Sequence, residues 1–141
     1  LGKVLKVKDE QFGDLGAEDN NEFLNIFDMG FQNQNEFPFE NKKIYATNPF
    51  DFGSDLEAMS AISVNTVSGN ESTINRRKDI FSAQLESMEG IAFHYVCKMN
   101  KLDFVQIRAV SNYITLRNKS DWKIAVAIEN LNSYLIKKFS V

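Results

Sequence analysis

The amino-acid sequence predicts an α/β domain in which a central mixed sheet is flanked by helices. Strand-like and helical segments alternate along the second half of the chain at the spacing of crossover units. Residues 104–110 form a nearly continuous apolar run, which is typical of a strand buried on both faces. The chain has 141 residues, 43% of them hydrophobic and 25% charged, so its size and composition are those of one globular domain.

In the first half of the chain, strand and loop signals surround one predicted helix. A short strand is expected at residues 4–7, and the glycines of residues 12–16 indicate a turn after it. Residues 18–29 predict a helix, because apolar side chains recur at helical spacing and acidic residues occupy the first turn. Asparagine and proline give residues 30–49 the chemistry of a loop, interrupted by a brief strand at residues 43–46.

The second half of the chain has a more regular pattern. Ser120 can cap a last helix, whose apolar stripe comprises Ile124, Ile128, Leu131 and Leu135. Before it, strands are expected at residues 61–67, 83–88 and 104–110, and helices near residues 72–81 and at residues 89–99.

Composition and charge exclude several classes of protein. No apolar run approaches the roughly 18 residues that span a bilayer, so no membrane association is expected. Acidic residues outnumber basic ones by twelve to five in residues 1–58, and basic residues outnumber acidic ones by eleven to seven in residues 59–141. Neither part has the clustered positive charge of a nucleic-acid-binding protein. Cys97 is the only cysteine, which excludes an internal disulfide and favours a reducing, cytoplasmic location.

Three short polar clusters mark the candidate site. Residues 68–70, 88–90 and 111–113 each lie where a predicted strand ends. Ligands of open α/β sheets bind outside the carboxyl ends of the strands, so these clusters are expected to face one crevice. Strand ends also need turn residues whatever the function, and each cluster alone is equally well explained as a turn. Their coincidence favours a ligand site.

Glu89 and Asn112 have the most informative side chains of these clusters. A carboxylate in the first turn of a helix is stabilised as an anion, which suits Glu89 to hold a ribose diol or to oppose positive charge on a sugar ring. Met88 can pack on a sugar face or belong to the core. Asn112 can accept and donate hydrogen bonds but has no proton to transfer. Each residue also has an ordinary interpretation, as helix-start acid, core methionine and turn former.

Other polar residues are assigned no chemistry. His94 and Cys97 lie on the helix predicted at residues 89–99. His94 has no Ser or Cys partner at a recognisable spacing, and Cys97 is expected to be buried and inert. The basic run at residues 76–78 is interpreted as a solvated helix face. There is no glycine-rich nucleotide motif and no paired Cys/His spacing, so neither a metal nor a cofactor is expected.

The sequence resembles the purine nucleoside phosphorylase and nucleosidase superfamily at residues 86–90 (ESMEG) and 108–113 (RAVSNY). Methylthioadenosine/S-adenosylhomocysteine nucleosidases carry a Met-Glu pair and a Ser-Asp pair at these places. Residues 15–19, 36–39 and 65–71 add a likeness to the futalosine hydrolases of menaquinone biosynthesis. The resemblance covers nearly the whole chain. It implies that residues 1–141 are the C-terminal part of a single nucleoside phosphorylase-like domain, whose upstream strands carry a glycine-rich loop and the acid that activates the attacking water.

The resemblance implies hydrolysis of the N-glycosidic bond of a purine nucleoside by a homo-oligomeric enzyme. Asn112 and Glu89 are its implied catalytic residues: Asn112 addresses the purine N7 and the six-position substituent, and Glu89 holds the ribose hydroxyls. An asparagine can donate to O6 or N7 of a 6-oxopurine, which favours futalosine as substrate and hypoxanthine as leaving base. The implied substrate-binding residues are Met88, beneath the sugar, together with Ser111, Ser72 and Thr73.

Three alternative functions stay open at this point. The first is a methylthioadenosine/S-adenosylhomocysteine nucleosidase, which Asn112 disfavours. The second is a phosphorylase that uses phosphate in place of water, and the third is a non-catalytic nucleoside-binding module.

Phenylalanine is concentrated near the N-terminus, where residues 1–52 hold eight of the twelve. Residues 23–52 are expected either to wall a pocket for the aryl tail of futalosine or to cover a subunit interface. Lys42 and Lys43 are the nearest cations expected for the carboxylate of that tail.

Overall fold

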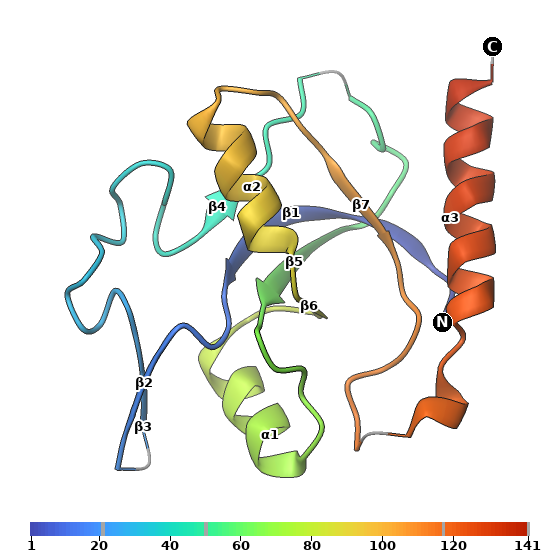
Figure 1. The fold of residues 1–141 in the computed structure, drawn as a ribbon. Helices are drawn as coiled ribbons and strands as arrows, with labels where there is room; N and C mark the ends of the chain where they lie inside the picture. Colours follow the sequence, from blue (N-terminus) through green and yellow to red (C-terminus); the bar gives the residue numbers. More distant parts are fainter. Residues whose placement is uncertain (21, 50, 117, 141) are drawn as a thin grey trace.

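The computed structural model describes residues 1–20, 22–49, 51–116 and 118–140, and within them a five-stranded mixed sheet forms the centre (Figure 1). The main sheet and the separate β2–β3 hairpin comprise β1 (Val4–Phe12), β2 (Gly16–Asp19), β3 (Glu22–Asn25), β4 (Ile44–Tyr45), β5 (Ala58–Ser63), β6 (Leu85–Ser87) and β7 (Gln106–Ala109). The helices are α1 (Glu71–Ile80), α2 (Gly90–Met99) and α3 (Ile124–Phe139), with a short 3₁₀-helix, η1 (Lys119–Asp121), before α3.

Strand β1 organises the main sheet. Along one edge it pairs in parallel with β5, placing Phe12 opposite Ser63, and β6 pairs in parallel with β5. Along its other edge, the N-terminal half of β1 pairs antiparallel with β7 and the C-terminal half pairs antiparallel with β4. The predicted α/β class with a mixed sheet and flanking helices is therefore confirmed.

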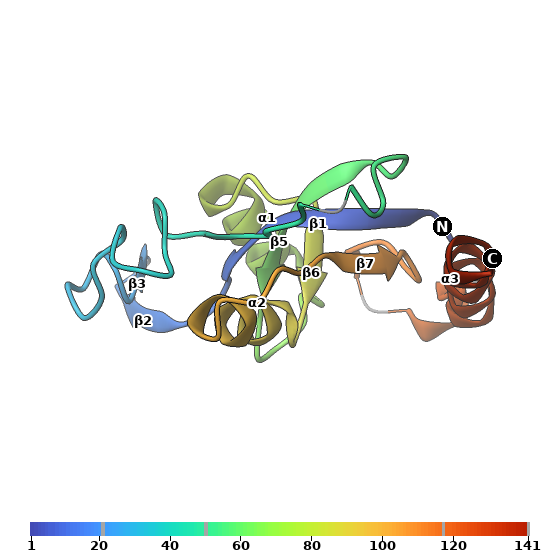
Figure 2. The same cartoon turned by 90° about the horizontal axis from the view of Figure 1, so that it is seen from above.

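The helices lie around this sheet in different positions (Figure 2). Helix α2 packs on β1, β5 and β4, covering one face. Helix α3 stands at the far end of β1 beside the N-terminus of the chain, where Asn130 Nδ2 donates to the Gly2 carbonyl at 2.8 Å. The β2–β3 hairpin projects from the opposite end of the molecule. None of the helices in the described part of the chain combines the length and apolar character of a membrane span.

Apolar side chains of the sheet and of α1 and α2 form the core. Leu5 and Val7 alternate along β1 with half-buried neighbours, as a sheet with one face covered requires. The core contains two clusters: Phe39, Ile44 and Ile91 under α2, and Ile62, Val64 and Phe81 near α1. Asn70 starts α1, because its Oδ1 accepts from the Thr73 amide at 2.9 Å.

The helix predicted at residues 18–29 is wrong. Strands β2 and β3 pair as a hairpin here, with Gly16 opposite Asn25, and residues 26–29 form a turn. Gly16 permits this pairing, since a Cβ there would lie 2.1 Å from the Leu24 carbonyl oxygen. Asn20 has a positive φ of 57°, a turn conformation that asparagine tolerates. Turn chemistry thus overrides a helical spacing of apolar residues that was fortuitous.

Two further expectations need correction. Strand β7 is half-buried along its length and lines a cavity, so the expected burial on both faces is wrong. Ser120 does not cap the last helix: it lies in η1, bonded to Asn118, and α3 begins at Ile124. In the predicted stripe Ile124 and Ile128 are exposed, and Ala127 is the buried residue on the sheet-facing side.

Candidate functional site

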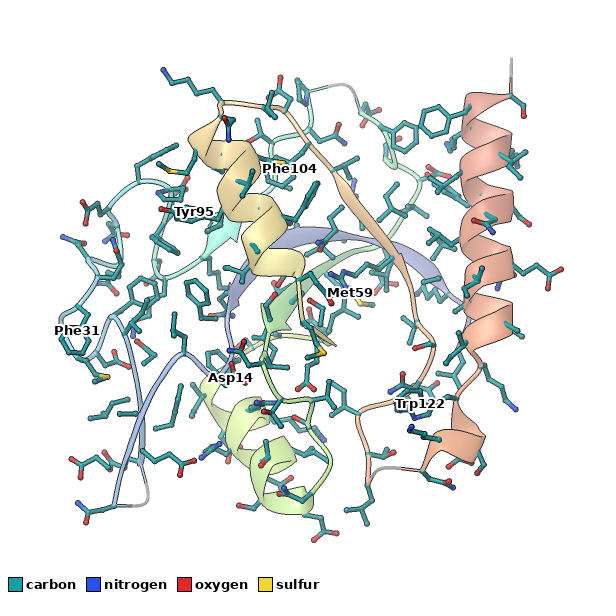
Figure 3. The ribbon with its side chains drawn as sticks, viewed as in Figure 1. Asp14, Phe31, Met59, Tyr95, Phe104 and Trp122 are labelled. Carbon is teal, nitrogen blue, oxygen red and sulfur yellow. The ribbon has the colours of Figure 1, made fainter. Side chains whose placement is uncertain are left out.

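A cavity of about 1180 Å³ lies against the sheet. Its floor comes from β1, β5, β6 and β7, and its walls from α1 and from the segment that follows β7. Met59 of β5 and Trp122, just after η1, both belong to its lining (Figure 3). Cavities that hold small molecules in proteins are about 300–1,000 Å³, so this space accommodates a ligand of nucleoside size with room beyond it.

Ser111 and Asn112 line this cavity. They follow β7 directly, and the Ser111 carbonyl accepts from the Lys123 amide at 2.7 Å, which ties the segment to the start of α3. Ser111 Oγ donates to Asn112 Oδ1 at 2.7 Å, while Asn112 Nδ2 donates to the Tyr113 carbonyl at 3.2 Å. The first bond fixes the orientation of the carboxamide, because its oxygen is engaged as acceptor. The second N–H of Nδ2 is available to a ligand.

Met88 and Glu89 lie between β6 and α2. Neither is among the described residues that line the cavity. Glu89 occupies the residue before the first turn of α2 and makes no side-chain capping bond, and its backbone carbonyl accepts from the Phe93 amide. Met88 is 51% exposed, so it is not a core residue. Glu86, three residues before Glu89, does line the cavity.

Ser72 and Thr73 lie in the first turn of α1 and are also outside the described lining. Ser72 is exposed, and Thr73 contributes its amide to the Asn70 cap. The adjoining wall is instead formed by Val67 and Ser68, in the loop before α1, and by Ile74 and Arg77 in the helix.

A buried ion network, which sequence reasoning missed, forms the α1 wall. Arg77 is 7% exposed, and its guanidinium lies 3.0 Å from Glu86 Oε2 and 3.3 Å from Asp14 Oδ2. Glu86 in turn accepts from the Ser68 amide and hydroxyl. The interpretation of residues 76–78 as a solvated face is therefore wrong for Arg77. The sequence did hold a signal for the burial of Arg77: it lies three residues after the apolar Ile74, and residues three apart share a helix face.

A second buried polar cluster lies under α2, around Glu10. Glu10 is fully buried, and burial is the main reason that its pKa rises to about 7, partly offset by the Ser63 hydrogen bond and by Arg108. Its neighbour Asp9 accepts from Ser60 Oγ at 2.7 Å and lies 3.0 Å from the Lys43 ammonium. Sequence reasoning did not single out these two acids, because an acidic pair in a strand ordinarily faces water.

His94 and Cys97 are both buried in the structure. His94 Nδ1 lies 2.9 Å from the Ile44 carbonyl oxygen, so that nitrogen carries the proton. Burial lowers the pKa of His94, chiefly through desolvation. The expectation that Cys97 is buried is confirmed, and the absence of a partner serine or cysteine for His94 agrees with a structural role for its ring against Phe104.

Gln106 and Arg108 bring polar groups from β7 to the cavity. Within the described residues, Gln106 Oε1 and Arg108 Nε are buried without a hydrogen-bond partner. Buried polar groups are satisfied in most proteins, so these two atoms are candidate contacts for a bound ligand or water.

The phenylalanine-rich stretch does not line the cavity in the described structure. Phe39 is a core residue, with its ring 5.1 Å from Phe27 in an edge-on contact, whereas Phe31 and Phe37 are exposed. Lys42 pairs with Asp28 at 2.6 Å, and Lys43 pairs with Asp9. None of the described residues 23–49 and 51–52 lines this cavity, and the aromatic core and local ion pairs engage several of them. The expectation that this stretch forms a pocket wall or a subunit interface stays a prediction. In the described part of the chain no cluster of three or more His, Cys, Asp or Glu could hold a metal ion.

The fold of this chain is similar to that of several solved nucleosidase structures. The S-adenosylhomocysteine nucleosidase from Streptococcus pyogenes, in complex with 5-methylthiotubericidin, is similar with a TM-score of 0.67 and 14% identity over 100% of this chain and 62% of that chain. The futalosine hydrolase of Helicobacter pylori is similar with a TM-score of 0.64 and 12% identity over 97% of this chain and 61% of that chain.

A third similar structure is a 5'-methylthioadenosine/S-adenosylhomocysteine nucleosidase from Borrelia burgdorferi bound to adenine. It gives a TM-score of 0.66 and 18% identity over 96% of this chain and 59% of that chain. The chain thus spans about 59–62% of the length of these three structures. No family model matches the sequence, and no curated protein matches it either. These likenesses establish the fold.

Proposed function

We propose that this chain forms part of an enzyme that hydrolyses the N-glycosidic bond of a purine nucleoside. The observation that carries the proposal is the place of Asn112, which lines the large cavity with one amide N–H free for a ligand. The nucleosidase fold supports it, since three relatives with that fold are nucleoside hydrolases by name.

Cleavage of this bond makes two demands on the protein. The leaving base must have its developing negative charge neutralised, and the ribose must be stabilised as positive charge develops on its ring. Asn112 meets the first demand by donating an N–H to N7 or O6 of the base. Its oxygen already accepts from Ser111 Oγ, so towards the base its amide can only donate, which suits the O6 acceptor of a 6-oxopurine and not a 6-amino group. Asn112 has no proton to transfer, so it stabilises the departing base by hydrogen bonding alone.

Glu89 meets the second demand. It is the residue before the first turn of α2, and its side chain makes no capping bond there. The anion can accept from both hydroxyls of a ribose and oppose the charge of the sugar cation. Met88 precedes it with an exposed side chain, free to pack beneath the ring.

Futalosine is the nucleoside that we propose as substrate. Asn112 favours a 6-oxopurine, and the cavity extends beyond nucleoside size along apolar residues such as Ile62, Val67 and Phe81. That wall offers a place for an aryl group attached beyond the ribose, since burial of an aromatic ring is among the larger apolar gains.

Product analysis on the protein as its gene encodes it tests this proposal. Futalosine, inosine and methylthioadenosine are supplied separately, with and without inorganic phosphate, and the released bases are separated by chromatography. We expect hypoxanthine to be released faster than adenine, with futalosine cleaved fastest and phosphate making no difference. Asn112→Ala is expected to lower kcat by about 10²–10³-fold, the cost of one preorganised donor.

The matched control is Asn132→Ala, which changes an exposed asparagine on α3. Faster release of adenine would refute the role of Asn112, and a requirement for phosphate would make the enzyme a phosphorylase. Binding without turnover of any of the three nucleosides would reduce the protein to a nucleoside-binding module.

A further inference from the structure

Helix α2 begins without a cap of its own. Glu89, the residue before it, makes no side-chain capping bond. The amides of a first helical turn have no partner inside the helix, so each needs one from elsewhere. The Ile91 amide finds it on another element: it donates to Ser63 Oγ, at the end of β5, at 2.7 Å. Ser63 therefore acts as a remote N-cap for α2.

The Ser63 hydroxyl is held in turn by Glu10 of β1. It lies 2.9 Å from Glu10 Oε2, to which it donates, and 3.4 Å from Ser87 Oγ. A hydroxyl has one proton to donate and two lone pairs, so donating to Glu10 leaves its oxygen free to accept from Ile91. The carboxyl group orients the hydroxyl that caps the helix.

The same carboxyl group lies directly against the first residue of α2. A Cβ built on Gly90 would fall 1.8 Å from Glu10 Oε1, so only glycine fits while Glu10 stays in place. Glu10 Oε1 has no hydrogen-bond partner within the described residues. One oxygen thus contacts the helix start by packing, and the other reaches it through a hydrogen-bonded serine.

We propose that Glu10 is a positioning residue, which fixes the first turn of α2 through the Ser63 hydroxyl and thereby fixes the place of Glu89. This inference rests on the function proposed above, because the place of Glu89 matters to catalysis only there. Glu89 adjoins Gly90 in the chain, so a shift of the first turn moves its carboxylate. A misplacement of about 1 Å in a catalytic group can cost 10²-fold in rate.

The charge of Glu10 makes this anchor sensitive to pH. The charged and titratable groups around the carboxyl are Asp9 on β1 with its ion-pair partner Lys43, Arg108 on β7 and His94 on α2. Ionisation strengthens the bond from Ser63, because hydrogen bonds to a carboxylate are shorter and stronger than those to a neutral acid. The chemical shift of the Ile91 amide is therefore expected to change when Glu10 is ionised.

NMR of the Ile91 amide in this chain tests the anchor without any ligand. We expect its chemical shift to follow pH with a midpoint near 7 in the unmodified chain, and to lose this step in Glu10→Gln. Ser63→Ala is expected to speed hydrogen exchange of the Ile91 amide by roughly 5- to 10-fold, the scale of a lost N-cap. The matched control is Ser60→Ala, which removes an equally buried β5 serine that bonds Asp9 instead.

Equal exchange of Ile91 in Ser63→Ala and Ser60→Ala, or a pH step that persists in Glu10→Gln, would overturn the proposal. The pH titration of the unmodified chain requires no variant to fold. In the hydrolysis assay, Ser63→Ala is expected to lower kcat by up to about 10²-fold with a smaller change in KM, and Ser60→Ala to leave both close to their original values. Absence of hydrolysis in the unmodified protein would refute the proposed function alone, since the Ile91 measurements do not depend on turnover.

Discussion

The buried carboxyl group of Glu10 makes the stability of the fold depend on pH. Its pKa is about 4.5 in an exposed chain and about 7 in the folded protein, chiefly because burial disfavours the charged form. Below pH 4.5 the group is neutral in both states. As pH rises from there to 7, only the unfolded state ionises, so the stability that Glu10 contributes at low pH is lost across this window.

The first prediction concerns this window. The free energy of unfolding of the unmodified chain, relative to that of Glu10→Gln, is expected to fall by about 3 kcal/mol between pH 4.5 and 7.5. Urea denaturation of both proteins across this pH range measures the difference. His94 and the surface carboxylates titrate in both proteins and cancel. A difference that stays constant with pH would show that Glu10 is ionised in the folded protein throughout.

At the scale of elements, α1 is attached to the sheet by charge more than by apolar packing. Ile74 and Arg77 are its buried residues, and Arg77 joins Asp14, after β1, to Glu86, in β6. Figure 3 shows Asp14 beside the helix. Removing one partner of a buried ion pair leaves the others desolvated and uncompensated, which costs far more than removing an exposed pair.

The adjacent residues Arg76 and Arg77 allow the free-energy cost of losing an exposed ion pair to be compared with that of losing a buried one. Arg77→Met is expected to lower the free energy of unfolding by about 3–5 kcal/mol, since the buried Glu86 carboxylate and the partly buried Asp14 carboxylate lose their cation. Arg76→Met is expected to cost about 0.2–1 kcal/mol, since Arg76 is partly exposed and pairs with the exposed Glu18. Denaturant unfolding of the two variants measures both values. Similar costs at the two positions would contradict a network centred on Arg77.

A comparison of α1 and α2 with the β2–β3 hairpin shows why some elements could be predicted from the sequence and others could not. Residues 72–81 and 89–99 were predicted close to the bounds of α1 and α2, because helix starts and apolar spacing agree there. At residues 18–29 the two signals conflict: the spacing favours a helix, whereas the turn around Asn20 favours a hairpin. The hairpin pairing of Gly16 with Asn25 agrees with the turn signal, and the helical spacing of the apolar residues outweighed that signal in the prediction.

At the scale of the whole molecule, the cavity joins residues that are far apart in the sequence. Leu5 of β1, Glu86 of β6 and Asn112 after β7 all line it. A ligand site at residues 111–113 could be predicted from their polar side chains but not from the carboxyl-end rule, because β7 runs antiparallel to β1 and ends at the opposite end of the sheet from β5 and β6. The anchoring of α2 by Glu10 could not, since it depends on a strand pairing that brings β1 and β5 together over some fifty residues.

The central claim is that this cavity takes a purine base at Asn112, and an NMR titration of the chain with inosine tests it most directly. We expect the side-chain amide of Asn112 to shift on titration, with weaker shifts for adenosine at equal concentration. Asn112→Ala is expected to weaken inosine binding by about 10-fold, the scale of one lost hydrogen bond. Shifts confined to residues outside the cavity, or equal binding of inosine by Asn112→Ala, would contradict the account.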